Sequence, residues 1–487
     1  MGPHPHLTLD SIPIEVLWYI ISFISVFDII RLQKVSKFFK DVTEVDIIWR
    51  NAYRTTSLPR CPGPFPHQST ETLKNALVQS ARLTCNWADP KSAPRPTSRR
   101  NIDSQEGDKQ HDLLFGRWLM YIDKAQTQVK CVDLDVTNCE DIPVVVYRST
   151  VKIRNFSCLA TTTLDGQTSA FAIVLERRHQ PVNSSATIKL FKLSGYLGPA
   201  LSFELAESYP IDWRSNAMQA TIGPRLLVIS GIRPWMYSND VLYVDLDTFS
   251  TYSVALPPMT PGNAVQNVQF IPCAAHLLVL HTLTVRGSHP PSLFEAFSIP
   301  AAHEGPKPTS LALTHRSLYH NPSYSDVVLL HDPVVAPWIG EASICLAVTT
   351  TPSVRDQETT EEVQSVVRLF LSNDSSTSPG TITCETQDLF SYPSWGRCFC
   401  FSSSSNGAGR GIRFALSAPW GDPFCELQAI TLAVEGPSQV SHTVLSIDTH
   451  HIATEREMLY DGYRGRLLWL PRSSDYSQNS VELLDFV

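Results

Sequence analysis

The chain has 487 residues, of which 43% are hydrophobic and 18% charged, and its formal net charge is −8. This composition is typical of a folded globular protein and excludes a disordered chain. No stretch approaches the roughly 18 to 20 apolar residues of a membrane-spanning helix, and residues 1–10 lack the basic and apolar regions of a signal peptide. We therefore expect an intracellular protein, cytoplasmic or nuclear, that does not bind a membrane.

Residues 7–53 are expected to form four short helices. Pro13 suits the first position of the first helix, where a missing N–H loses no hydrogen bond. Ser25, Ser36 and Asp46 are the expected N-cap residues of the next three helices. Apolar residues recur at helical spacing in the first helix, at Leu17, Ile20, Ile21 and Ile24. Four such helices cannot bury this much apolar surface alone, so a partner or the rest of the chain must cover part of it.

Five motifs follow one another in this segment: I-P-x-E-V-L, I-x-x-F-I-S, D-I-I-R-L, V-S-K-F-F and I-W-R. Their order resembles an F-box, the helical module through which substrate receptors attach to the Skp adaptor of cullin-RING ubiquitin ligases. The resemblance covers about a tenth of the chain. The alternative is an ordinary four-helix cap packed on its own domain.

The resemblance implies that the Skp adaptor is contacted by the hydrophobe and proline that open the segment and by apolar residues of the following helices. Some of the matching residues must instead form the small core of the module itself. The matching positions are Ile12, Pro13, Val16, Leu17, Ile20, Ile29, Leu32, Val35 and Trp49.

Residues 54–110 carry 9 Lys and Arg against 5 Asp and Glu, and they include seven prolines. This composition predicts an exposed linker. One helix is expected within it at about residues 70–87, where Leu73, Leu77 and Trp87 could join the helical head to the body.

Residues 111–487 are rich in short runs that alternate with period two, which predicts an all-β domain. The runs recur in clusters roughly every 50 to 65 residues, as in a β-propeller of four-stranded blades. We expect six or seven blades, with a large β-sandwich or a pair of β-domains as the alternative. The segment SVELLDF near the C-terminus is expected to complete the blade begun at residues 113–134. The C-terminal segment DGYRGRLLWL, followed by a short loop and SVELLDF, resembles the end of many fungal F-box proteins with propeller-like bodies.

The sequence offers no motif for catalysis, a phosphate loop or a metal site, so we expect neither a cofactor nor an enzyme. Cys398 and Cys400 form a C-x-C pair, but no second pair or histidine cluster completes a zinc set. Residues 111–487 carry 25 Lys and Arg against 36 Asp and Glu. This net charge of −11 makes nucleic acid an improbable ligand.

These observations favour a substrate-receptor subunit of a Skp–cullin–F-box ubiquitin ligase, in which the β domain binds an unknown protein substrate. The alternatives are an F-box scaffold that acts without a cullin and a propeller enzyme with a helical head. Trp235, Tyr237 and Trp395 stand beside turn-forming residues. They could lie on a recognition rim or fill gaps between blades.

Overall fold

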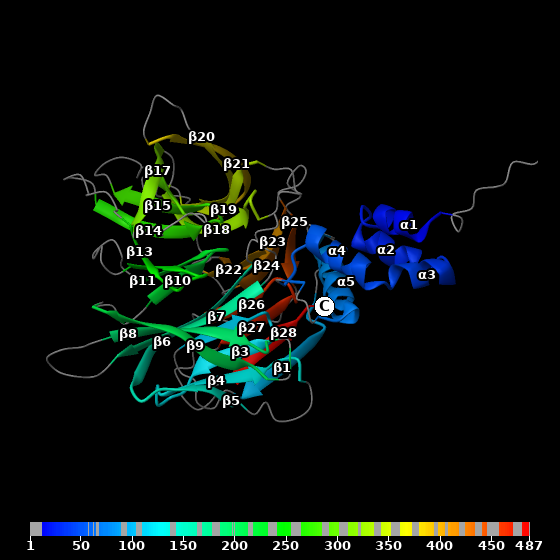
Figure 1. The fold of residues 1–487 in the computed structure, drawn as a ribbon, viewed down its shortest axis with the longest axis horizontal. Coiled ribbons are helices and arrows are strands. Elements are labelled where there is room, and N and C mark those ends of the chain that lie inside the picture. Colours follow the sequence, from blue (N-terminus) through cyan, green and yellow to red (C-terminus); the bar gives the residue numbers. More distant parts are fainter. Residues whose placement is uncertain are drawn as a thin grey trace, which may run out of the picture.

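The structure is a computed structural model in which a small helical head stands beside a large domain of β-strands (Figure 1). It describes residues 12–56, 58–61, 63–64, 68–88, 95–103, 110–136, 143–162, 168–177, 186–196, 198, 200–212, 218–231, 241–254, 264–284, 292–300, 310–319, 323–335, 342–351, 361–372, 379–393, 398–404, 408–417, 424–433, 441–445, 457–470 and 480–486. This arrangement confirms the predicted fold class, an all-α N-terminal unit followed by a large all-β domain.

Four short helices form the head: α1 (Ile14–Ile21), α2 (Val26–Leu32), α3 (Lys37–Thr43) and α4 (Asp46–Thr55). Two of the predicted caps are confirmed. The hydroxyl oxygens of Ser25 and Ser36 accept hydrogen bonds of 3.2 Å from the backbone N–H groups of Asp28 and Phe39. Each bond satisfies one of the N–H groups that a helix start leaves without an intrahelical partner.

The prediction that Asp46 caps α4 is wrong. Val45 occupies the N-cap position, and no side chain caps the helix there. The Asp46 carboxylate instead pairs with Arg50 one turn later, at 2.5 Å, and accepts a hydrogen bond of 2.8 Å from Thr70. Asp46 therefore fastens α4 to the start of the next helix.

The core of the head is completed by helix α5 (Thr70–Ala88), which lies within the segment predicted as linker. Trp49 is fully buried in this core, and its indole N–H donates to the backbone oxygen of Thr43 at 2.8 Å. Ile48 faces the core, whereas Ile47 is 57% exposed. The α5 residues that join this core are Leu73, Leu77 and Ala81.

The far end of α5 packs on the β domain. Trp87 is fully buried and lies against Tyr460 and Phe486, with ring centroids 6.0 Å and 6.4 Å away. The amide of Gln79 also reaches the backbone oxygen of Arg464 at 3.5 Å. One continuous helix thus belongs to the core of the head and to the surface of the β domain (Figure 1).

Within the described residues, the β domain consists of seven four-stranded antiparallel units, which we call blades 1 to 7. Blade 1 contains β2 (His111–Leu114), β3 (Trp118–Ile122), β4 (Gln128–Asp133) and β5 (Val144–Arg148). Blade 2 contains β6 (Lys152–Thr162), β7 (Thr168–Arg177), β8 (Ala186–Ser194) and β9 (Ser202–Ile211). Blade 3 contains β10 (Met218–Ile222), β11 (Leu226–Gly231), β12 (Val241–Asp245) and β13 (Thr251–Val254). Blade 4 contains β14 (Ala264–Pro272), β15 (His276–Thr284), β16 (Ser292–Ser298) and β17 (Ser310–Tyr319).

Blade 5 contains β18 (Ser323–His331), β19 (Ile344–Thr351), β20 (Glu361–Ser372) and β21 (Thr381–Pro393). Blade 6 contains β22 (Cys398–Ser404), β23 (Ala408–Ser417), β24 (Phe424–Ala433) and β25 (Ser441–Leu445). Blade 7 contains β26 (Glu457–Asp461), β27 (Arg466–Leu470), β28 (Ser480–Asp485) and, on its outside, β1 (Ser98–Asp103). A short parallel contact between β13 and β17 joins the outer strands of blades 3 and 4.

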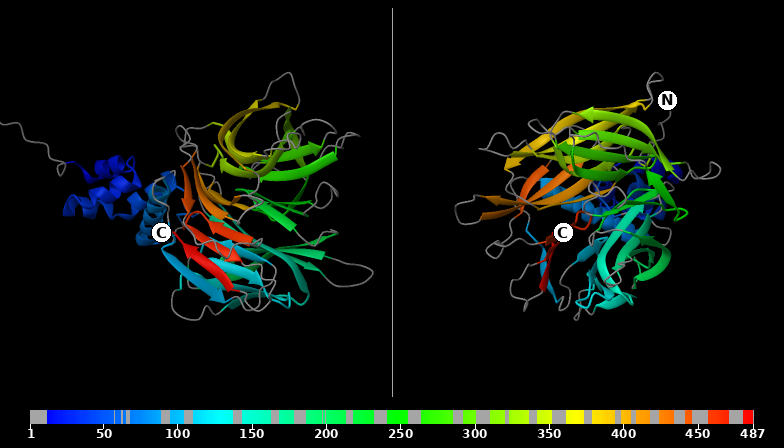
Figure 2. Two further views of the ribbon diagram at one scale, coloured as in Figure 1. Left: turned by 180° about the vertical axis from the view of Figure 1, so that it is seen from behind. Right: turned by 90° about the vertical axis from the view of Figure 1, so that its left-hand side faces the viewer.

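The blades form a closed ring. The first strand of each blade contacts the first strand of the next, in the order β2, β6, β10, β14, β18, β22, β26 and back to β2 (Figure 2). This closed order is that of a seven-bladed propeller, which agrees with the prediction of six or seven blades.

The strand that closes the ring differs from the prediction. The segment SVELLDF forms β28, and it pairs with β1 rather than with the strands at 113–134. Ser98 lies opposite Asp485, and Asp103 lies opposite Ser480. The propeller therefore begins at residue 98, inside the segment predicted as linker, and blade 7 unites strands from both ends of the domain.

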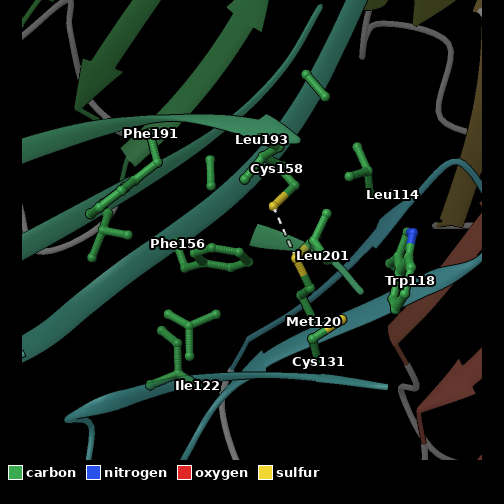
Figure 3. Packing of buried hydrophobic residues seen from close by; sticks show 14 of the residues in the cluster. Leu114, Trp118, Met120, Ile122, Cys131, Phe156, Cys158, Phe191, Leu193 and Leu201 are labelled. Atoms are coloured by element: carbon green, nitrogen blue, oxygen red, sulfur yellow. Dashed lines mark hydrogen bonds between the residues drawn. The ribbon is translucent and has the colours of Figure 1, made fainter. Parts of the chain in front are cut away.

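The hydrophobic core lies between neighbouring blades. The cluster between blades 1 and 2 includes Met120, Phe156 and Cys158, and the Cys158 thiol lies 3.5 Å from the Met120 sulfur (Figure 3). The central strands β3 and β11 are buried along their whole length. Each blade packs against another on both faces, so these strands read as continuous apolar runs and lack the expected alternation.

Charged residues line the seam between blades 1 and 7. Asp135 accepts hydrogen bonds of 2.6 Å from both Arg464 and Arg466. The Arg466 guanidinium also binds Asp485 at 2.7 Å and the backbone oxygen of Gly116 at 2.7 Å. These contacts fasten the last blade to the first.

Candidate functional site

Helix α1 has apolar residues on two faces. It begins at Ile14, one residue later than predicted, because Pro13 is the N-cap residue. Its inner face buries Leu17 and Ile21, which are 3% and 2% exposed. The outer face carries Val16, Tyr19 and Ile20, and Phe23 of the turn after the helix continues their spacing of i, i+3, i+4 and i+7. We call these four apolar side chains the α1 stripe.

The α1 stripe is open to solvent. The exposed fractions of Val16, Tyr19, Ile20 and Phe23 are 46%, 68%, 48% and 71%. Tyr19 and Phe23 pack edge to face, with ring centroids 4.9 Å apart, so the stripe has a defined shape. Helix α1 lies at the end of the head that is remote from the propeller (Figures 1 and 2). A contiguous apolar surface of this kind typically marks a protein-binding site.

The nine residues predicted to contact an adaptor fall into three groups. Leu17, Ile29 and Trp49 are buried in the core of the head. They therefore support the surface residues above them and do not themselves contact a partner. Ile12 and Leu32 are half-buried and pack against that core. The exposed members are Pro13, Val16, Ile20 and Val35.

Sequence reasoning missed four exposed apolar residues of the head: Ile14, Tyr19, Phe23 and Ile47. Two of them belong to the α1 stripe. The sequence did contain the signal for the stripe. Val16, Tyr19, Ile20 and Phe23 have the same i, i+3, i+4, i+7 spacing as the apolar set that begins at Leu17, shifted by one residue toward the N-terminus. A short helix that is apolar on both faces needs a second partner besides its own core.

The propeller offers no comparable surface among the described residues. Its large exposed apolar side chains are spread over blades 1, 2, 4 and 5: Val136, Val144, Leu205, Leu318 and Val334. The candidates Trp235, Tyr237 and Trp395 lie outside the described residues.

The described residues include no metal-binding cluster. Among them, no three His, Cys, Asp or Glu side chains are placed to hold a metal ion. Cys398 and Cys400 do lie on one strand, β22. Burial raises the pKa of the Cys131 thiol to about 12, so that this thiol is not an activated nucleophile. No helix within the described part of the chain is long and apolar enough to span a membrane.

Comparison with known families identifies the head. The family model for F-box-like domains matches residues 9–55, the segment that contains α1 to α4. The head is an F-box-like domain. Among curated proteins, none matches this chain.

The F-box supports an adaptor or substrate-receptor role for the protein in general, and such domains generally bind Skp-type adaptors. It is typical of non-catalytic subunits. In this chain the F-box core extends beyond the matched segment, because Leu73, Leu77 and Ala81 of α5 complete it. The F-box and the propeller are therefore joined by a packed helix.

Proposed function

We propose that this protein is the substrate-receptor subunit of a Skp–cullin–F-box ubiquitin ligase. Its F-box binds the Skp adaptor, and through it a cullin, and its propeller binds a target protein. The observation that carries this proposal is the α1 stripe on an F-box-like domain, because its four apolar side chains remain exposed after the core of the head is complete.

The energetics favour a protein partner for the stripe. Burying apolar surface yields about 25 cal/mol per Å², and aromatic side chains such as Tyr19 and Phe23 are common hot spots of interfaces. Val35, in the turn after α2, is 67% exposed and adds apolar surface to the same domain. Pro13 supports the start of α1, because its backbone oxygen accepts hydrogen bonds from Val16 and Leu17.

The chain would contribute proximity rather than chemistry. A receptor that holds a target near a ubiquitin-charged enzyme raises the effective concentration of the target lysine. Helix α5 suits this role because it is shared by the F-box core and the propeller surface. A fixed relation between the two domains would set where the target is presented.

The first test is the affinity of the full chain for the Skp adaptor, measured by calorimetry. The double change Val16→Ala, Ile20→Ala should weaken binding by about 1–3 kcal/mol, since it truncates the centre of the stripe. Circular dichroism should show an unchanged fold, because both side chains are about half exposed. The matched control is Val144→Ala on the outer strand of blade 1, where an exposed valine lies far from the head. Equal affinities for the double variant and the control would refute the adaptor role of the stripe.

The second test concerns the cullin. The tagged full chain is purified from cells, and the adaptor and cullin are assayed in the eluate. Recovery of both supports the ligase assignment, whereas adaptor without cullin supports an F-box scaffold that acts outside a ligase. Recovery of neither, with turnover of a small molecule, would favour a propeller enzyme.

A further inference from the structure

A cavity of about 250 Å³ lies where the F-box meets the propeller. Its walls come from the end of α4, the segment that follows it, α5, and the turns of blades 1 and 7. The residues that matter here are Tyr53, Arg60, Thr72, Asn75 and Arg464. No part of the proposed function uses this cavity.

Arg60 is a buried cation that forms no ion pair with any residue in the described part of the chain. The residue is 7% exposed, and its guanidinium lies over the Tyr53 ring, 4.9 Å from the centroid. One terminal nitrogen donates a long hydrogen bond of 3.3 Å to the backbone oxygen of Arg54. The Nε–H is buried without a hydrogen-bond partner. A buried guanidinium without a carboxylate is costly, so this arrangement calls for an anion.

The neighbouring groups do not supply that anion. Burial holds the pKa of Tyr53 and of Tyr463 well above the ordinary value, so both phenols are neutral at pH 7. Asp461 is engaged elsewhere, because its carboxylate accepts hydrogen bonds from the backbone N–H groups of Tyr463 and Arg464 at 2.7 Å and 3.0 Å. Asp135, which pairs with Arg464 at 2.6 Å, belongs to the seam between the blades.

The rest of the lining suits a small polar ligand. The Thr72 hydroxyl and the Asn75 amide project from α5, and Gln68 and Gln79 also line the cavity. Sites for drug-sized molecules usually exceed about 300 Å³, so the occupant must be smaller. A guanidinium binds phosphate and carboxylate groups through charge-assisted hydrogen bonds.

We propose that this cavity binds a small free oxyanion, of the phosphate or carboxylate class, with Arg60 as its principal ligand. The anion neutralises the charge of Arg60 and accepts hydrogen bonds from its guanidinium group. Tyr53 of the F-box and Arg60 of the segment after it line one side of the cavity, and the propeller contributes Phe115, Tyr463 and Arg464, so the bound anion touches both domains. It therefore stabilises the orientation of one domain relative to the other.

The test is direct binding of inorganic phosphate, and in a second arm citrate, to the full chain, measured by calorimetry and by thermal unfolding. Saturating ligand should raise the unfolding temperature by about 1–3 °C. Sodium chloride at equal ionic strength should not. Arg60→Gln should weaken binding about 10- to 100-fold and abolish the thermal shift. The matched control is Arg82→Gln, which removes the same charge from an exposed position of α5 outside the cavity and should leave binding unchanged.

Asn75→Ala keeps the proposal testable if the Arg60 variant fails to fold. Asn75 is an exposed helix residue that lines the cavity, so its truncation should spare the fold and weaken anion binding severalfold. Failure of the wild-type chain to bind either phosphate or citrate would overturn the proposal. Binding that survives both Arg60→Gln and Asn75→Ala would also overturn it. These measurements do not involve the adaptor, so they are independent of the ligase assignment.

Discussion

Trp87 of helix α5 stacks on Tyr460 of blade 7, with ring centroids 6.0 Å apart and ring planes inclined by 20°. Trp87 is fully buried, and Phe486 also packs against it, edge to face. This contact holds the C-terminal end of α5 on the propeller, while the N-terminal half of the helix lies in the F-box core.

Trp87→Ala should therefore destabilise the protein strongly. Truncation of a buried tryptophan costs about 3–5 kcal/mol, and here the loss falls at the contact between the two domains. Denaturant unfolding followed by circular dichroism measures the change. Tyr19→Ala, which truncates an aromatic side chain that is 68% exposed, is the control and should change stability little. Equal stability of the two variants would contradict the packing role of Trp87.

Trp49→Phe should affect the fold of the head and spare adaptor contact. The substitution removes the hydrogen bond of 2.8 Å to Thr43 and part of a fully buried ring. We expect a loss of about 1–2 kcal/mol of stability, with unchanged adaptor affinity of the folded protein in calorimetry. Val35→Asp should leave stability unchanged and weaken adaptor binding, because Val35 is exposed. Normal stability with weakened adaptor binding in Trp49→Phe would assign Trp49 to the interface.

The seam between blades 1 and 7 should weaken in acid. Burial alone would raise the pKa of Asp135, but attraction by Arg464 and Arg466 outweighs burial, and the pKa lies below its ordinary value. A lowered pKa in the folded state contributes stability that is present above the unfolded value, about 3.9. That stability is lost as the pH falls through the folded value. As the pH is lowered from about 5 through the folded pKa of Asp135, the free energy of unfolding should therefore fall more for the wild-type protein than for Asp135→Asn.

Asp135→Asn should itself cost stability at pH 7, because Arg464 and Arg466 would lose their shared carboxylate. We expect about 1–3 kcal/mol, less than for a fully buried pair, since Asp135 is partly exposed. Asp28→Asn, which breaks an exposed pair with Arg31 in the F-box, is the control and should have little effect. Parallel pH profiles for wild type and Asp135→Asn would contradict this account of the seam.

Gly116→Ala should also strain the seam. Gly116 has a φ of +62°, and a Cβ atom there would lie 2.2 Å from an oxygen of the buried Asp461. A left-handed backbone and a clash of this kind together cost about 1–3 kcal/mol. Gly198→Ala, where a Cβ would approach a backbone oxygen to only 3.3 Å, should cost less in thermal unfolding.

Much of the F-box could be predicted because its signals are local. Ser25 and Ser36 cap the helices that follow them, and the helical spacing of Leu17 and Ile21 places both in the core. The error at Asp46 arose because its carboxylate has a better partner in Arg50, which only the folded helix brings within reach. The sequence alone did not separate interface from core, since both faces of α1 are apolar.

The propeller was predictable as an architecture, but its closing strand was not. The segment SRRNID reads as a loop because the outermost strand of a blade buries little. Of its residues 98–102, Ile102 is buried and the other four are not. A repeated signal in the blades also passed unnoticed. An Arg at the start of a strand, or just before it, pairs with an Asp at the end of the next strand, as in Arg117 with Asp133 and Arg466 with Asp485.

The pairing of β1 with β28 has a consequence for synthesis. Arg99 and Glu482, which form an ion pair across these strands, are 383 positions apart in the chain. On the ribosome, the four F-box helices emerge early, and β1 must then wait unpaired until almost the whole propeller has been translated. A chain that terminates before β28 would therefore carry an F-box beside an open ring with an exposed strand edge. Such an edge can pair with the strands of other chains, so the truncated protein would aggregate or be bound by chaperones.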